Sequence, residues 1–157
     1  MHPTPSSTFS ATRHSVVKPP PSPSLSPRRV LVVDDNKDVR EVLVELLTDQ
    51  GYEVSAACNG QQALTKVLIH PPDIVLLDLV MPVMSGWEFL ALRAWYPVLN
   101  RLSIIVMSAV DSSLDVAAVV LKPFLVEEVL QALGRVYGLP VTEDFGSPFR
   151  RVARGRA

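Results

Sequence analysis

The chain has 157 residues but only one cysteine, Cys58, so an internal disulfide is excluded and a reducing compartment is favoured. No apolar run approaches the roughly 18 residues of a membrane-spanning helix, and we therefore expect a cytoplasmic protein. The seven glycines include no G-x-G pattern, which argues against a dinucleotide-binding loop or a P-loop. The net charge of −1 argues against a strongly basic nucleic-acid binder.

The composition changes sharply near residue 28. Residues 1–28 contain seven prolines, seven serines and no acidic residue. Such a segment buries too little apolar surface to offset its ordering entropy, so we predict a disordered Pro/Ser-rich tail. Residues 29–138 carry 8 basic and 14 acidic residues and are expected to form one folded domain. Residues 139–157 are predicted to form a basic C-terminal tail.

Short β-branched runs alternate with helical patterns throughout residues 29–138. The runs predict five strands buried on both faces of a parallel sheet; they cover residues 29–33, 53–57, 73–77, 103–107 and 119–122. Four helices are expected between or after these strands. The first begins after Asn36, the second after Asn59 and the third after Ser85–Gly86, and the last covers residues 125–136. In the first helix, three-and-four spacing groups Val39, Val42, Leu43, Leu46 and Leu47 on one face. This alternation predicts a doubly wound α/β fold.

Polar residues stand at the carboxyl ends of four of these strands. Ligands bind beyond this edge in doubly wound sheets; the residues there are Asp34, Asp35, Asp78, Ser108 and Lys122. Three carboxylates brought together raise each other's pKa unless a cation intervenes. A hard divalent cation such as Mg²⁺ prefers such oxygen ligands, so the strand ends predict a metal site.

Four motifs in this part of the chain closely resemble the receiver domain of two-component response regulators. They are VLVVDDN (30–36), LLDLVMPVMSGWEFL (76–90), IIVMSA (104–109) and LKPF (121–124). The resemblance covers about residues 29–137. It implies a flavodoxin-like five-stranded parallel sheet with strand order 2-1-3-4-5.

The resemblance also implies a role for each polar residue at the strand ends. Asp78 matches the phosphoacceptor, whose carboxylate attacks a phosphoryl group. Lys122 would pair with one phosphoryl oxygen and Ser108 would donate a hydrogen bond to another. The Lys122–Pro123 bond matches the cis peptide of the family.

The metal ligands follow from the same resemblance. Asp35 matches the principal ligand of Mg²⁺ (or Mn²⁺), and Asp34 matches a more distal ligand acting through water. Asp78 and the backbone carbonyl of Val80 complete the set. The metal would offset the charge between Asp78 and the incoming phosphoryl oxygens.

The sequence departs from the family pattern at several positions. The switch position three residues before the lysine is Val119 rather than an aromatic residue. The side chains that flank the phosphoryl group and tune its hydrolysis are two apolar ones, Val80 and Val110. Only residues 109–121 separate Ser108 from Lys122. We therefore expect the family's fourth helix, which lies between the last two strands, to be one or two turns long, around Ser112–Ala117, or irregular.

The function implied is that of a stand-alone phosphoacceptor domain, not an enzyme beyond its own phosphorylation and dephosphorylation. A histidine kinase or histidine phosphotransfer protein would donate the phosphoryl group, and an unidentified downstream protein would receive the signal. Neither nucleic acid nor a membrane is an expected partner, and the sequence leaves the oligomeric state open.

Three alternatives remain at this stage. The first is a phosphorylation-independent (pseudo-receiver) module that binds partners through the altered fourth-helix and fifth-strand face. The second is an aspartate-nucleophile hydrolase of similar topology, which would need a cap segment and a further acid. The third is nucleic-acid binding through the basic tails, which predicts steep salt dependence.

Overall fold

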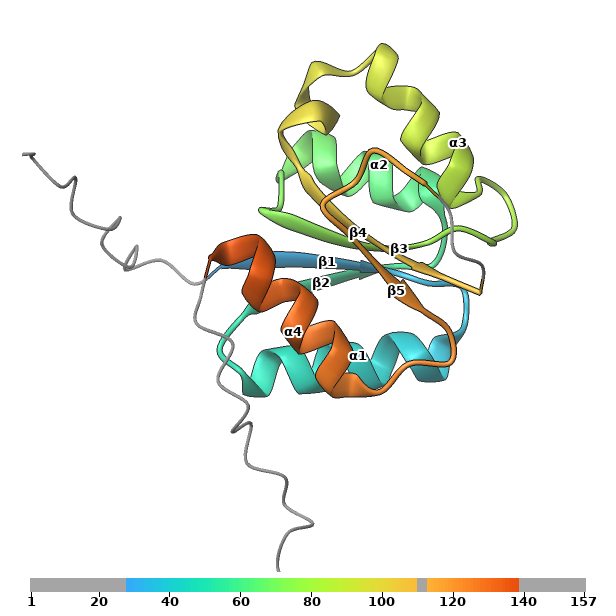
Figure 1. Ribbon diagram of the computed structural model, residues 1–157. Helices are drawn as coiled ribbons and strands as arrows, with labels where there is room; N and C mark the ends of the chain where they lie inside the picture. The colour runs from blue at the N-terminus through green and yellow to red at the C-terminus, as the bar shows by residue number, and fades with distance from the viewer. Residues whose placement is uncertain (1–27, 110–112, 139–157) are drawn as a thin grey trace, which may run out of the picture.

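The computed structural model describes residues 28–109 and 113–138, which contain a five-stranded parallel sheet (Figure 1). The strand order is β2-β1-β3-β4-β5, as the resemblance implies. The strands are β1 (Arg29–Val33), β2 (Glu53–Ala57), β3 (Ile74–Asp78), β4 (Ser103–Ser108) and β5 (Ala118–Leu121). The predictions made for residues 1–27, for the tail at 139–157 and for Val110 lie outside the described residues.

Helices cover both faces of the sheet (Figure 1). One layer contains α1 (Lys37–Asp49) and α4 (Val126–Tyr137). The other contains α2 (Gly60–Ile69) and α3 (Gly86–Ala91), followed by the 3₁₀ turns η1 (Leu92–Ala94) and η2 (Pro97–Arg101). None of the helices in the described part of the chain has the length and apolar character needed to cross a membrane.

The three central strands, β1, β3 and β4, are buried on both sides because they direct alternate side chains into two cores. In β1, Leu31 and Val33 pack in the core under α2 and α3. Val30 and Val32 pack in the core under α1 and α4. This arrangement explains why the central strands are continuous apolar runs rather than alternating ones. The prediction of burial on both faces is wrong for the edge strands, since β2 alternates between exposed and half-buried residues and β5 is only partly buried.

Side-chain caps determine where the first three helices begin. Asn36 accepts hydrogen bonds from the backbone N–H groups of Asp38 and Val39, and Asn59 accepts one from Gln62. Ser85 and Glu88 form a reciprocal capping box at α3. The expected start points are therefore confirmed.

The first helix differs from its expected face at one position. Leu43 and Leu47 are buried, but the side chain of Val42 is 53% exposed. Val42 precedes Leu43 by one residue, which turns it about 100° around the helix and away from the sheet.

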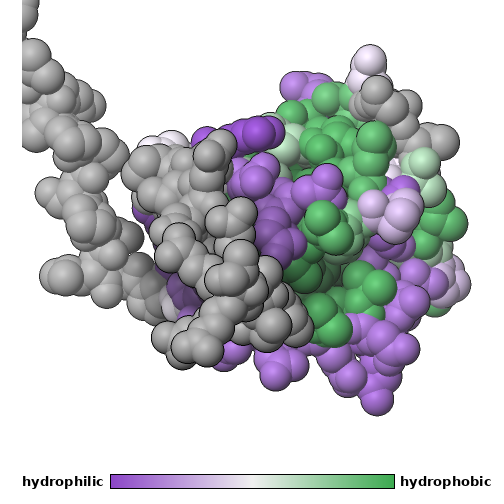
Figure 2. All heavy atoms as spheres, turned by 60° about the horizontal axis from the view of Figure 1, so that its bottom comes forward, coloured by the Kyte–Doolittle hydropathy of each residue, from purple (hydrophilic) through white to green (hydrophobic). Residues whose placement is uncertain are grey.

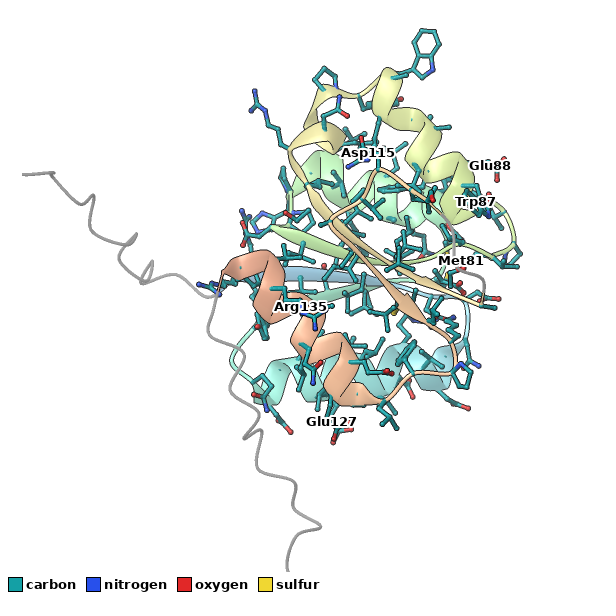
Figure 3. All side chains as sticks on the ribbon, in the orientation of Figure 1. Met81, Trp87, Glu88, Asp115, Glu127 and Arg135 are labelled. Atoms are coloured by element: carbon teal, nitrogen blue, oxygen red, sulfur yellow. The ribbon has the colours of Figure 1, made fainter. Side chains whose placement is uncertain are left out.

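The connection from β4 to β5 contains no helix over its described residues, 113–117. Leu114 and Val116 instead pack directly on the core under α2 and α3. The guanidinium of Arg93 donates a hydrogen bond of 2.6 Å to the backbone oxygen of Asp115, which lies on the α2 and α3 side of the sheet (Figure 3). The Ala117 N–H donates to the Ile104 oxygen and starts the pairing of β5. Over residues 113–117 the connection is therefore irregular, which is one of the two forms that the sequence predicts.

Candidate functional site

Three aspartates meet where β1 and β3 end at the carboxyl edge of the sheet. Asp34 and Asp35 follow β1 directly, and Asp78 is the last residue of β3. One carboxylate oxygen from each lies within 4.8 Å of the others. Asp34 is fully buried and Asp78 is 6% exposed, whereas Asp35 is exposed. The predicted convergence of these acids is therefore present in the structure.

Lys122 reaches the same cluster from the end of β5. Its ammonium lies 2.9 Å from Oδ2 of Asp34 and 3.1 Å from Oδ2 of Asp78. The backbone N–H of Lys122 donates to the Ser108 oxygen, which places the ends of β4 and β5 side by side. The Lys122–Pro123 peptide bond is cis.

The surroundings of Asp78 and Lys122 act on their pKa values in opposing ways. Burial raises the pKa of Asp78 above its usual value, although the Val80 N–H and the Lys122 charge partly offset this effect. Burial alone would lower the pKa of Lys122. The hydrogen bond and charge of Asp34, together with Asp78, outweigh that effect and raise it, so the lysine is a cation at neutral pH.

Backbone and side-chain hydrogen bonds hold the acids in place. Oδ1 of Asp34 accepts from the Asn36 N–H at 2.9 Å. Oδ1 of Asp78 accepts from the Val80 N–H at 3.2 Å. The guanidinium of Arg40, on the first turns of α1, donates at 2.7 Å to the backbone oxygen of Asp34. Sequence reasoning missed Arg40, because nothing in the spacing distinguishes it from any other helical arginine.

Gly86 allows α3 to begin directly against the site. Its N–H donates to the Leu79 oxygen at 3.0 Å. A Cβ atom there would overlap the backbone oxygen of Asp78 and lie 2.8 Å from the Cα of Leu79. The capping residue Glu88 and its neighbour Trp87 lie on the exposed side of this short helix (Figure 3). The glycine therefore positions the phosphoacceptor candidate as well as starting the helix.

Three further predicted residues belong to β4, to β5 and to the segment that follows β3. Ser108 ends β4 and is 3% exposed. Val119 is half-buried in β5, pairs in register with Val106 and packs on the core under α2 and α3. The side chain of Val80 is 76% exposed beside Asp78. Val110 lies outside the described residues.

An open hollow of about 640 Å³ borders Asp34 and Asp35 and is also lined by Val39, Pro123 and Phe124. Figure 2 looks onto the α1 and α4 layer and shows apolar residues gathered over part of it. The exposed apolar residues of α1, β5 and the start of α4 are Val42, Leu121 and Leu125.

The donor set fits a hard divalent cation. Three carboxylates bring three negative charges, and Lys122 supplies one positive charge against them. Carboxylate oxygens are the ligands that Mg²⁺ prefers, and exposed Asp35 leaves room for the waters this ion retains. The residues that could hold the metal are thus Asp34, Asp35 and Asp78.

Comparison with known proteins matches this geometry to a family. The family model of the response regulator receiver domain matches residues 30–133. The transcriptional regulatory protein KdpE of Mycobacterium tuberculosis is 42% identical over 112 residues, which cover 66% of this chain and 48% of KdpE. The chain thus spans about half the length of such relatives. The chemotaxis protein CheY of Thermotoga maritima is 35% identical, over 69% of this chain and 97% of that protein.

Solved structures show the same similarity. The chemotaxis response regulator CheY4 of Vibrio cholerae superposes with a TM-score of 0.66 at 30% identity. The match covers 71% of this chain and 99% of that one. The similarity includes all five strands in the order described above.

Proposed function

The chain belongs to the receiver-domain family of response regulators, which serves phosphorylation-based two-component signalling, and we propose that Asp78 is its phosphoacceptor. The observation that carries this proposal is the joint contact of Lys122 with Asp34 and Asp78 inside the three-aspartate cluster. Receiver domains are signalling modules rather than classical enzymes. The phosphorylation-independent alternative is not favoured.

The proposed reaction transfers a phosphoryl group to a carboxylate. An Oδ atom of Asp78 attacks the phosphorus of a phosphohistidine, and the N–P bond breaks as the new O–P bond forms. The Val80 N–H holds Oδ1 of Asp78, which limits rotation of the carboxylate before attack. The phosphohistidine donor would be a histidine kinase or a histidine phosphotransfer protein.

The neighbouring residues then stabilise the charge that arrives. The Lys122 ammonium is already 3.1 Å from Asp78 and would turn to a phosphoryl oxygen. Ser108 lies at the end of the adjacent strand, where its hydroxyl would donate to another oxygen. Mg²⁺ (or Mn²⁺), held by Asp34, Asp35, Asp78 and the Val80 carbonyl, would neutralise charge between carboxylate and phosphoryl oxygens.

We propose that the domain transmits its signal without the aromatic switch of the family. Val119 has no ring to move behind Ser108, and the 113–117 segment packs where a helix would otherwise lie. A small shift of β5 and this segment would then carry the signal to a downstream protein. The exposed Val80 side chain cannot position an attacking water, so self-dephosphorylation would depend on other groups. The proposal also includes a cytoplasmic location, a single folded domain over residues 29–138 and a tail on each side of it.

Intact mass after incubation with acetyl phosphate and Mg²⁺ tests the proposal. We expect a phosphoryl adduct on the wild type that is lost in Asp78→Asn and in the presence of a chelator. Asp115→Asn removes an exposed aspartate of the β4–β5 connection and should keep the adduct. An adduct that persists on Asp78→Asn would refute the assignment. The assignment would also be refuted if the folded wild type accepted a phosphoryl group neither from acetyl phosphate nor from a phosphohistidine protein.

A further inference from the structure

A second cavity, of about 510 Å³, lies at the end of the sheet opposite the aspartate cluster. It is bordered by the residues at which β1, β3 and β4 begin and by the last turn of α4. Three arginines line it: Arg28, Arg29 and Arg101. Since the aspartate cluster occupies the carboxyl ends of the same strands, this cavity is a separate site.

The three guanidinium groups keep hydrogen-bonding capacity to spare. Within the described residues none of them forms an ion pair with an acidic side chain. The guanidinium of Arg28 lies over the ring of Tyr137, 4.0 Å from its centroid, and this contact uses the face of the guanidinium rather than its N–H edge. Arg29 contacts His70 Nε2 at 3.0 Å.

The charge of the cavity is clearly positive. Its one acidic lining residue is Asp73, whose Oδ2 accepts the backbone N–H of Arg29 at 2.8 Å. The lining therefore has a formal charge of +2 from three arginines and one aspartate. Guanidinium forks match the oxygens of phosphoryl and carboxylate groups, so this surplus selects an oxyanion.

Tyr137 adds a hydrogen-bond donor to the wall. Its hydroxyl oxygen is buried and has no hydrogen-bond partner among the described residues. Burial raises the pKa of Tyr137, and Asp73 raises it further, so the hydroxyl keeps its proton at neutral pH. A buried hydroxyl without a partner is costly, and an oxyanion in the cavity would provide an acceptor.

Apart from Ser103, the rest of the lining is apolar and includes Pro72, Ile74, Val98, Leu102 and Val136. Pockets of this kind bind ligands with an apolar body and a few polar contacts that fix its orientation. We propose that this cavity binds a small organic oxyanion, in which a phosphoryl, phosphonyl or carboxylate group is attached to an apolar body.

Calorimetric titration of the full chain with three probes tests this proposal. The probes are phenylphosphonate, benzoate and inorganic phosphate, used at low salt with EDTA present so that metal-dependent binding at the aspartates does not contribute. We expect phenylphosphonate or benzoate to bind more tightly than inorganic phosphate, because only the first two have an apolar body. Whichever of the two binds better identifies the oxyanion group. Binding should weaken as salt is added.

Arg101→Ala is the deciding variant because Arg101 is exposed and its loss should not unfold the domain. It should weaken binding about tenfold to a hundredfold, the effect of one charge-assisted hydrogen bond. Arg135→Ala is the matched control, since this exposed arginine of α4 is not part of the lining (Figure 3). Equal affinities of the wild type and Arg101→Ala would overturn the proposal and locate binding elsewhere. Absence of binding to the wild type, or equal affinity for inorganic phosphate and the organic anions, would also overturn it.

Discussion

The ammonium of Lys122 lies 2.9 Å from a carboxylate oxygen of Asp34, a fully buried residue 88 positions earlier in the chain. Once the site holds its ligands, we expect Lys122 to contact a phosphoryl oxygen and Asp34 to bind the metal. In the structure described here they neutralise each other. The pair therefore stabilises the site before its ligands arrive, and it also competes with them.

Lys122→Met should lower the stability of the metal-free protein and increase its response to Mg²⁺. Loss of the cation leaves Asp34 and Asp78 without their ion-pair partner, which should cost about 2–4 kcal/mol in unfolding free energy. The same change removes the competitor for the carboxylates, so the rise in Tm on adding Mg²⁺ should be larger than in the wild type.

Thermal unfolding with EDTA and with Mg²⁺ measures both effects. Lys37→Met is the control, because Lys37 forms only an exposed ion pair with Glu41 at 3.6 Å and should change Tm little. A smaller Mg²⁺ response in Lys122→Met than in the wild type would contradict competition between lysine and metal.

Gly86→Ala should damage both stability and the proposed phosphoacceptor site. The added methyl group would overlap the backbone of Asp78 and Leu79, at a cost of about 3 kcal/mol, in the upper range for overpacking. Gly51→Ala is the comparison, because its Cβ would meet nothing within 4 Å and only its φ of +86° is unfavourable. That change should cost about 1 kcal/mol.

Urea unfolding and acetyl phosphate labelling distinguish the two glycines. Under conditions where both variants are folded, Gly86→Ala should label poorly and Gly51→Ala should label like the wild type. Normal labelling of Gly86→Ala would mean that the start of α3 does not position Asp78.

Leu114→Ala tests whether the 113–117 segment replaces the packing of a helix. Leu114 is half-buried against the core under α2 and α3, so its truncation should cost about 1–2 kcal/mol in unfolding free energy. The side chain of the adjacent Asp115 is exposed, and Asp115→Ala should change stability by less than about 0.5 kcal/mol. Equal urea midpoints for the two variants would show that the segment adds no packing energy.

Glu88→Gln should reduce the pH dependence of stability in the acidic range. The backbone N–H and hydroxyl of Ser85 donate to the Glu88 carboxylate and lower its pKa below the usual 4.5. A carboxyl whose pKa is lowered by folding stabilises the protein above its unfolded pKa, and this stabilisation is lost as the pH falls through the folded pKa.

The Tm difference between the wild type and Glu88→Gln should therefore shrink as the pH falls below the usual value of 4.5. Thermal unfolding at several acidic pH values measures this, and NMR titration of the Glu88 carboxyl checks the direction of the shift. Glu127→Gln, in the first turn of α4, controls for the loss of one negative charge. A Tm difference that is constant with pH would argue against the capping box as the cause.

Local patterns in the sequence were sufficient to predict the strands and the helix starts of the fold. The β-branched runs predicted the five strands to within one or two residues at their ends, and Asn36, Asn59 and Ser85 predicted the helix starts. These features depend on backbone propensity and on hydrogen bonds between near neighbours in the chain. The convergence of the aspartates was also predictable, because parallel strands bring their carboxyl ends to one edge.

Contacts between distant residues were decided only by the tertiary structure. The Lys122–Asp34 pair, the approach of Gly86 to Asp78 and the grouping of Arg28, Arg29 and Arg101 depend on strand register and helix packing. The sequence determined which side chains lie at each end of the sheet. Their distances, burial and partners depended on how the whole chain packs. These quantities are set by contacts between residues far apart in the sequence, which local patterns do not predict.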